Sequence, residues 1–161
     1  MNARTVLACV LLLALTACGF HLRGEATLPF ETMYVDGNTA LLVELKRNIA
    51  AGTHTQLVDR AADAQAVFAM DHEVREKVIL SIDTSGRVRE YRLRYRVGFS
   101  LRDAKGRDWM APNEIILTRD ISFNDQVLAK EAEELLLYRD MQTDMVQQIV
   151  RRLAAASLQE G

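Results

Sequence analysis

Cysteine and histidine are scarce in this sequence of 161 residues, which contains two cysteines and three histidines. Both cysteines, Cys9 and Cys18, lie near the N-terminus, and the histidines stand far apart at His21, His54 and His72. None of these residues has the neighbours that metal-ligand spacing requires, so the sequence predicts no metal site and no resident cofactor. His72 lies in a segment of alternating hydrophobic residues, where a hydrogen-bonded histidine of the core is expected.

The short motifs of common enzyme sites are also missing. The sequence has no glycine-rich phosphate loop, no nucleophile elbow and no cluster of cysteine with histidine. Acidic residues slightly outnumber basic ones, 22 against 20, so bulk charge does not indicate nucleic-acid binding. We therefore expect a protein that is not an enzyme and binds no nucleic acid, and any basic function must be local.

Only one long uncharged hydrophobic run is present, at residues 6–15, and it follows a single basic residue, Arg4. This run has the length of a signal peptide and is too short to span a bilayer as a helix. Small residues precede Cys18, as at a bacterial lipoprotein processing site. We expect residues 1–17 to be a cleaved lipoprotein signal peptide and Cys18 to carry covalent lipid. The alternative is an ordinary secretory signal with a coincidental cysteine.

The residues after the signal divide into an anchor and a domain. Cys9 leaves with the signal, so no disulfide is possible within the mature chain. Gly19 is not the aspartate that commonly retains lipoproteins in the inner membrane, which favours the outer membrane, on the periplasmic side. Residues 18–31 contain a proline and no hydrophobic period, so they are predicted to be a lipidated tether. Residues 32–161 are long enough for one domain with its own core.

The first part of this domain predicts a strand and a helix. Residues 32–36 are rich in strand formers and end in a turn cluster. A helix is predicted from about Ala40 to Ala51, capped by Asn38 or Thr39 and ended by Gly52. Its apolar stripe consists of Leu41, Leu42, Leu45 and Ile49. Residues 53–65 are a polar connection for which we predict no structure.

The most regular pattern is an alternation of apolar residues, at even positions over residues 68–82 and at odd positions over 91–101. A two-residue turn centred on Ser85–Gly86 would join these strands and bring both apolar sets to one buried face. The predicted buried pairs are His72 with Phe99, Val74 with Val97, Val78 with Leu93 and Leu80 with Tyr91. The same register predicts like-charge pairs on the other face, Arg75 with Arg96 and Lys77 with Arg94.

The C-terminal half predicts one more strand and a long helix. A turn at Lys105–Gly106 leads to a strand over residues 108–123, in which Pro112 indicates a bulge or a sheet edge. Residues 127–158 lack glycine and proline and predict a helix that Asn124–Asp125 could cap. Its buried stripe is predicted to be Leu135, Tyr138, Met141, Met145, Ile149 and Leu153. The predicted fold is α+β, a two-layer sandwich with two helices on one face of a mostly antiparallel four-stranded sheet, in the order β-α-β-β-β-α.

The sheet face opposite the predicted core is unusually basic, and two interpretations of it remain open. It is either a solvated face partly neutralised by carboxylates, or a guanidinium surface that binds phosphates or carboxylates. The neutralising residues would be Glu73, Glu90 and either Glu114 or Asp120. The basic residues of this face are Arg75, Lys77, Arg92, Arg94 and Arg96. Arg87 in the hairpin turn and Lys130 at the start of the last helix are separate exposed candidates.

The segment Cys18-Gly19-Phe20-His21-Leu22-Arg23-Gly24, which follows the signal, resembles the start of the LptE (RlpB) family of lipopolysaccharide-assembly lipoproteins. Residues 85–97, 119–123 and 128–130, then Met141 and Arg152–Leu153, are also similar to that family. The resemblance implies a lipid-anchored protein of the outer membrane that plugs the lumen of the LptD β-barrel. Such a protein assists assembly of the barrel and insertion of lipopolysaccharide into the outer leaflet.

The resemblance also implies lipopolysaccharide binding through basic residues. Lys130 matches a family position of this kind, and the hairpin tip matches another basic region, where Thr84 is not basic and Arg87 is the nearest substitute. The full set of candidates is Lys130, Arg87, Arg92, Arg94, Arg96, Arg75 and Lys77. The alternative function is a free outer-membrane lipoprotein that binds another anionic amphiphile or glycan, which predicts a ligand cavity between helices and sheet. A hydrolase would need an acid/base or nucleophile pair, and the sequence offers none.

Overall fold

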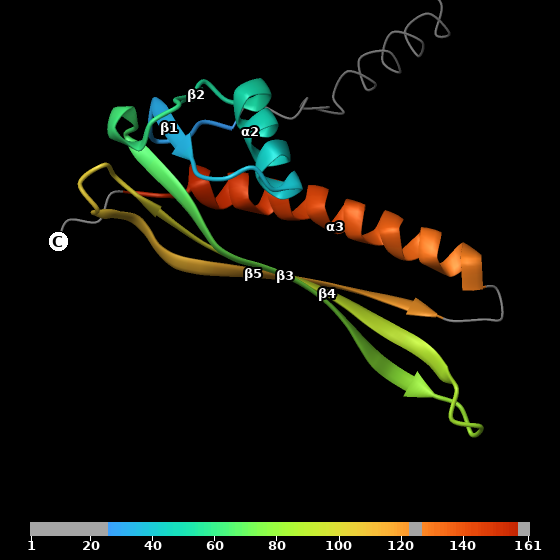
Figure 1. Ribbon diagram of the computed structural model, residues 1–161. Coiled ribbons are helices and arrows are strands. Elements are labelled where there is room, and N and C mark those ends of the chain that lie inside the picture. Colours follow the sequence, from blue (N-terminus) through green and yellow to red (C-terminus); the bar gives the residue numbers. More distant parts are fainter. Residues whose placement is uncertain (1–25, 123–126, 158–161) are drawn as a thin grey trace, which may run out of the picture.

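The computed structural model describes residues 26–122 and 127–157. One mixed sheet carries two helices on the same side (Figure 1). In chain order the elements are β1 (Thr32–Val35), α2 (Ala40–Gly52), β2 (Gln56–Leu57), a 3-10 turn (Ala61–Asp63), β3 (Ala66–Ile82), β4 (Val88–Arg102), β5 (Asp108–Ser122) and α3 (Val127–Ala154).

The sheet has five strands in the order β2-β1-β3-β4-β5. Strand β1 pairs in parallel with both β2 and β3, whereas β3, β4 and β5 form two antiparallel hairpins. The predicted α+β class is therefore confirmed, but the prediction of a sheet with four mostly antiparallel strands is wrong. The additional strand is the two-residue β2, within the segment for which no structure was predicted. So short a strand forms because α2 returns the chain alongside β1, which no local sequence pattern reveals.

The helix α2 forms as the sequence predicts. Thr39 is its N-cap, and the Thr39 hydroxyl accepts a hydrogen bond from the backbone N–H of Leu42 at 3.4 Å. The buried residues of α2 are the predicted stripe, Leu41, Leu42, Leu45 and Ile49. This stripe packs into the single hydrophobic core between the helices and the sheet.

The described residues before β1 pack against this core. Leu28 and Phe30 are buried, and the ring of Phe30 makes an edge contact with Trp109 on β5, with centroids 5.6 Å apart. The backbone N–H of Ala26 donates to the carbonyl of Gly52 at 3.0 Å. Core residues thus begin upstream of the predicted domain start at Thr32. Residues 18–25 of the predicted tether, Cys18 included, lie outside the described residues.

The β3–β4 turn is longer than the predicted two residues. It spans Asp83 to Arg87: Asp83 N–H donates to the carbonyl of Arg87 at 2.8 Å, and Gly86 N–H donates to the carbonyl of Asp83 at 2.9 Å. Gly86 has a φ of 81°, a conformation that residues with a side chain rarely adopt. The β4–β5 turn, Asp103 to Arg107, repeats the geometry and the sequence Asp-x-x-Gly-Arg.

This turn shifts the hairpin register by one residue, and the predicted pairing is wrong. Val74 lies opposite Arg96, Val78 opposite Arg92 and Glu76 opposite Arg94. Because side chains alternate between faces, a one-residue slip moves a whole set to the other face. The predicted like-charge pairs are therefore absent: Arg75 lies opposite Tyr95 and Lys77 opposite Leu93.

A bulge in β3 changes which residues of the strand face the core. Phe68 is buried opposite Leu101, but the register shifts between Met70 and His72. Beyond this point the charged odd residues of β3 share the inner face with the buried residues of β4. His72 was predicted to be in the core and is instead 44% exposed on the open face, so that prediction is also wrong.

The helix α3 is only partly buried. Met141, Met145, Ile149 and Leu153 are fully buried as predicted, but Leu135 is 71% exposed, so its place in the predicted stripe is wrong. In Figure 1, α2 covers the C-terminal half of α3 and does not reach its N-terminal half. The predicted cap Asn124–Asp125 lies outside the described residues.

Strand β5 is an edge of the sheet, as Pro112 predicted. The pairing of β5 with β4 is irregular around the proline, between Asn113 opposite Phe99 and Met110 opposite Leu101. Proline cannot donate to a ladder, so the break falls where the sequence demands it.

Candidate functional site

The predicted basic face is divided between the two sides of the sheet. Arg92, Arg94 and Arg96 lie on the open face, whereas Arg75 and Lys77 contact residues of α3 on the inner side. The five residues therefore do not form a single guanidinium surface. The division follows from the register shift, because odd and even residues of β3 exchanged faces.

On the open face each arginine has a carboxylate partner. Arg92 binds Asp120 with two hydrogen bonds of 2.8 Å, and this pair raises the pKa of Arg92 and lowers that of Asp120. Arg94 and Arg96 lie 3.6 and 3.5 Å from the carboxylate of Glu76. The open face is thus charge-compensated by Asp120 and Glu76. The prediction that Glu73 neutralises this face is wrong, because Glu73 accepts a hydrogen bond from Tyr95 on the inner side.

On the inner side Arg75 belongs to a polar network that connects strands and helices. The buried Tyr95 donates its hydroxyl hydrogen to Glu73 at 2.6 Å, and Arg75 donates to Gln142 of α3 at 2.9 Å. Gln142 in turn donates to Glu44 of α2 at 2.7 Å. Burial, reinforced by the hydrogen bond to Glu73, raises the pKa of Tyr95. Arg75 therefore has a structural role in this arrangement.

Lys77 forms the next contact along α3, an ion pair with Glu134 at 2.5 Å. Between Glu134 and Gln142 on α3, the Tyr138 hydroxyl donates to the backbone carbonyl of Glu76 at 2.9 Å. These polar contacts join the N-terminal half of α3 to β3 beside the apolar core, which here still includes Leu93 and Ile121.

Arg87 projects from the hairpin turn and is the most exposed of the predicted candidates, with 70% of its side chain accessible. Asp83 organises the turn: its carboxylate accepts from the hydroxyl of Ser85 at 2.6 Å and from the backbone N–H of Arg87 at 3.0 Å. These hydrogen bonds lower the pKa of Asp83 strongly, and the bond from the Ser85 hydroxyl has the largest effect. Arg89 lies 3.1 Å from the same carboxylate. The turn thus presents two guanidinium groups around one carboxylate.

Lys130 lies in the first turns of α3 and pairs with Glu133 at 2.7 Å. Only 15% of its side chain is accessible, so the prediction that Lys130 is exposed is wrong. The N-terminal end of α3 and the hairpin turn lie toward the same end of the molecule (Figure 1). The fold therefore places Lys130 and Arg87, the two isolated basic candidates, at a common end.

The same end carries exposed hydrophobic side chains, of which Val78, Leu80, Ile82 and Leu135 were predicted to be buried. On β3, Val78, Ile79, Leu80 and Ile82 are between 41% and 62% exposed, and Leu135 and Leu136 are exposed on α3. We call these six residues together with Arg87, Arg89 and Lys130 the hairpin end. Sequence reasoning missed this surface because alternating apolar residues predict a buried face, and only the register shows that Val78 lies opposite Arg92 on the open face.

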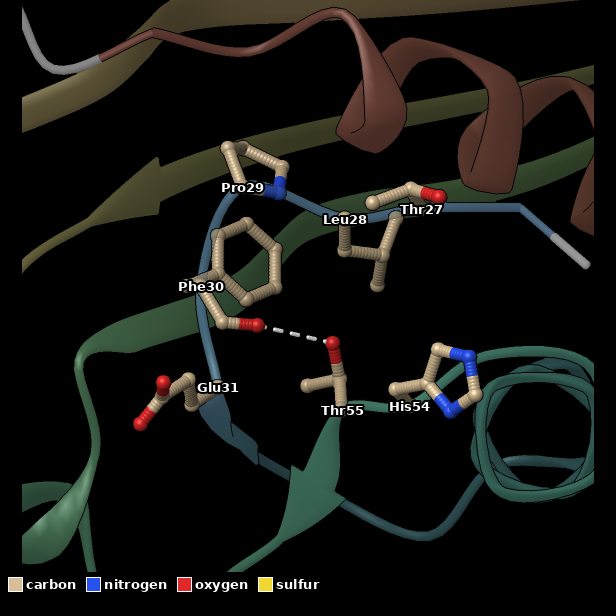
Figure 2. Close-up of a pocket in the computed structure, with 7 residues that line it drawn as sticks. All are labelled: Thr27, Leu28, Pro29, Phe30, Glu31, His54 and Thr55. Atoms are coloured by element: carbon tan, nitrogen blue, oxygen red, sulfur yellow. Dashed lines mark hydrogen bonds between the residues drawn. The ribbon is translucent and has the colours of Figure 1, made fainter.

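Two cavities lie at the other end of the domain. One, of about 270 Å³, is lined by Leu28, Phe30, His54 and Thr55, whose hydroxyl donates to the carbonyl of Phe30 at 2.8 Å (Figure 2). The second, of about 600 Å³, is a polar hollow beside the carboxyl ends of β1 and β2, next to Asp36 and Lys46. Neither is lined by α3, so neither of these two cavities lies between both helices and the sheet.

No group of three or more metal-ligating side chains occurs within residues 26–122 and 127–157. In that same part of the chain, neither helix combines the length and the hydrophobicity that a membrane-spanning helix needs.

Comparisons with known proteins identify the family. The model of the LptE family, described as lipopolysaccharide-assembly, matches residues 30–153. The chain belongs to the LptE family of lipopolysaccharide-assembly proteins, as the resemblance of residues 18–24 indicated. A search among curated proteins found no match.

Solved structures of lipoproteins share the fold. The solution structure of an uncharacterized lipoprotein B from Nitrosomonas europaea is 43% identical, with a TM-score of 0.75, covering 85% of this chain and 91% of that one. Rare lipoprotein B from Shewanella oneidensis is 25% identical, with a TM-score of 0.68, covering 77% of this chain and 94% of that one. A minor lipoprotein from Acinetobacter baumannii, 23% identical, has the same fold with a TM-score of 0.67, covering 83% and 99%.

Proposed function

We propose that this protein is anchored to the periplasmic side of the outer membrane by lipid on Cys18 and occupies the lumen of an LptD-type β-barrel. There it assists assembly of the barrel and insertion of lipopolysaccharide into the outer leaflet, without catalysing a reaction. The match of residues 30–153 to the LptE family is the observation that carries this proposal.

The outer surface of the domain is compatible with a barrel lumen. Such lumens are polar and hydrated. The open sheet face carries arginines that are each compensated by a carboxylate, as in the Arg92–Asp120 pair. A compensated face can lie against a polar wall without introducing a large net charge.

The hairpin end supplies the two chemistries that a lipopolysaccharide presents. Guanidinium and ammonium groups bind phosphates, and exposed aliphatic side chains favour contact with acyl chains. Arg87 and Arg89 lie beside the aliphatic residues of β3 in the hairpin, and Lys130 lies on α3 at the same end. We propose lipopolysaccharide binding at this end, with Arg87 and Lys130 as phosphate ligands.

Purification of the tagged full chain in mild detergent tests the partner. We expect a large outer-membrane β-barrel protein to copurify in equal amount and to be lost when the membranes come from cells depleted of it. A stable monomer without such a partner would contradict the barrel proposal. In that case binding of lipopolysaccharide by the monomer would favour the free amphiphile-binding lipoprotein.

A further inference from the structure

The two halves of α3 are attached to the domain in different ways. Among residues 130–140, the N-terminal half, no side chain is buried, and Leu135 and Leu136 are exposed. The C-terminal half is attached by five fully buried side chains: Met141, Met145, Val146, Ile149 and Leu153. Burial of apolar side chains is the main stabilising contribution to packing. The C-terminal half is therefore fixed, and the N-terminal half is held more weakly.

Helix α2 supports the fixed half of α3. Glu44 of α2 accepts hydrogen bonds from Gln142 at 2.7 Å and from Thr143 at 2.9 Å. In Figure 1 the N-terminal half of α3 extends beyond α2 over the sheet. Support from both α2 and the core therefore begins near Met141, which is the position expected for a hinge.

The N-terminal half of α3 contacts the sheet mainly through polar groups. Glu134 pairs with Lys77 at 2.5 Å, and the Tyr138 hydroxyl donates to the backbone carbonyl of Glu76 at 2.9 Å. Leu137 and Tyr138 are partly buried against the core. An ion pair that solvent still reaches contributes little to stability. A segment held in this way opens at a lower cost than the core does.

Beneath this half of α3, the inner face of the sheet is apolar and has a cation at its margin. Leu93 and Ile121 are buried there, and Tyr91 lies opposite Ile121. Lys77, which Glu134 contacts, lies opposite Leu93, and its ammonium group is 4.5 Å from the centre of the Tyr91 ring. Separation of the helix would therefore uncover an apolar floor beside one ammonium group.

The helix itself indicates what this floor binds. Glu134 places a carboxylate on Lys77, and Leu137 and Tyr138, which follow on the same side of the helix, place an apolar body against the core. A ligand that replaces them needs the same two parts, an anionic group and an apolar chain. An anionic amphiphile has both, and it brings no backbone groups that require hydrogen-bond partners.

We propose that residues 130–140 open from the sheet about a hinge near Met141, and that an anionic amphiphile binds on Tyr91, Leu93 and Ile121 with its anionic group on Lys77. In the closed state the carboxylate of Glu134 stands in for the anion. The ligand part of this inference rests on the proposed binding of lipopolysaccharide at the hairpin end, whereas the opening requires no ligand.

Opening is tested by thiol labelling of the full chain in nanodiscs of phosphatidylcholine. Leu93→Cys and Val97→Cys place cysteines at two fully buried positions of β4, and mass mapping measures the reaction of each with N-ethylmaleimide. Val97 lies opposite Ile115, next to the Glu114 carbonyl that Arg152 of the fixed half contacts. We expect Leu93→Cys to react about ten-fold faster or more. Equal rates would overturn the opening.

Hydrogen exchange of the wild-type chain tests the same opening without a substitution. We expect residues 130–139 to exchange about ten-fold faster or more than residues 143–153. Equal protection of the two halves of α3 would overturn the hinge near Met141.

The Lys77–Glu134 pair provides matched variants. In the Leu93→Cys protein, Glu134→Lys is expected to raise the labelling rate about three-fold or more, because like charges then meet. Addition of Lys77→Glu is expected to restore the original rate. Glu133→Lys is the control, since Glu133 pairs with Lys130 of the same helix, and should leave the rate unchanged. An equal rise for Glu133→Lys would overturn the role of the pair.

Dodecyl phosphate is the probe for the ligand, and dodecyltrimethylammonium is the control with the same chain and the opposite charge. We expect dodecyl phosphate to slow labelling of Leu93→Cys about five-fold or more, the control to leave it unchanged, and Lys77→Ala to abolish the protection. Protection by both amphiphiles or by neither would overturn the assigned ligand, as would protection found only in native membranes, which would indicate a protein partner. Lipopolysaccharide that binds without protecting Leu93→Cys would overturn this inference and leave the proposed function intact.

Discussion

The imidazole of His72 lies across Gly98 and reaches Glu114 two strands away, with Nε2 and Oε1 2.9 Å apart. A β-carbon added to Gly98 would lie 2.2 Å from Cε1 of His72. Glycine in the middle of a strand usually weakens it, so its presence here has a local reason. The absence of a side chain at position 98 lets the ring cross the strand.

Gly98→Ala is expected to destabilise the wild-type protein by about 1 kcal/mol, because the histidine must leave Glu114 or the strand must shift. In a His72→Ala background the same change is expected to stabilise by about 0.5 kcal/mol, since alanine is preferred to glycine in a strand. Urea unfolding of the four proteins in the cycle measures both values. An effect of the same sign in both backgrounds would show that the ring is not the obstacle.

Tyr95→Phe is expected to lower the free energy of unfolding by about 1–3 kcal/mol, because Glu73 and Arg75 lose their buried hydroxyl partner. Tyr138→Phe is the control; its hydroxyl donates to a single backbone carbonyl, that of Glu76, rather than to a charged group, so we expect a smaller loss. If the two variants lost equal stability, the network around Tyr95 would have no special role. Chemical denaturation with coincident fluorescence and circular dichroism transitions provides the comparison.

Asp83, Asp103 and Asp120 have pKa values below the ordinary range in the folded state. Their contribution to stability is complete above the unfolded pKa of about 3.9 and is lost as the pH falls toward the folded values. We therefore expect the melting temperature to fall below about pH 4. Asp83→Asn is expected to make this fall less steep. An unchanged slope in thermal melts between pH 2 and 6 would contradict the role of this carboxylate.

Arg87→Asp combined with Lys130→Asp is expected to weaken lipopolysaccharide binding about ten-fold or more without unfolding the domain, because two cationic ligands become anionic. The repeated turn supplies a control, since Arg107 holds the same position relative to Asp103 as Arg87 holds to Asp83. Arg107→Asp lies at the other turn and should leave binding unchanged. Titration of lipopolysaccharide into the full chain measures all three proteins. Equal binding by the double variant and the wild type would remove Arg87 and Lys130 from the site.

Cys18→Ala is expected to leave the fold intact and to release the protein from membranes that lack the barrel, because one cysteine carries the whole proposed lipid anchor. Circular dichroism and membrane fractionation report the two effects. Retention of Cys18→Ala in such membranes would show that lipid on Cys18 is not the anchor.

The sequence by itself determined the elements whose information is local. Thr39 and the stripe from Leu41 to Ile49 define α2, Gly86 and Gly106 mark the two hairpin turns, and Pro112 marks the edge strand. The motif from Cys18 to Gly24 and the residues of the hairpin were sufficient to indicate the family. Capping, left-handed turns and ladder breaks each depend on a few adjacent residues, so a sequence pattern can report them.

The tertiary structure alone decided which way the hairpin faces. A five-residue turn in place of two, with a bulge before His72, moved Val74 and Val78 to the open face and brought Arg75 and Lys77 toward α3. Period-two alternation states that two faces differ, but not which face meets the helices, because a shift of one residue exchanges them. The exposure of Val78 in the hairpin end arises from that shift, because it places Val78 opposite Arg92.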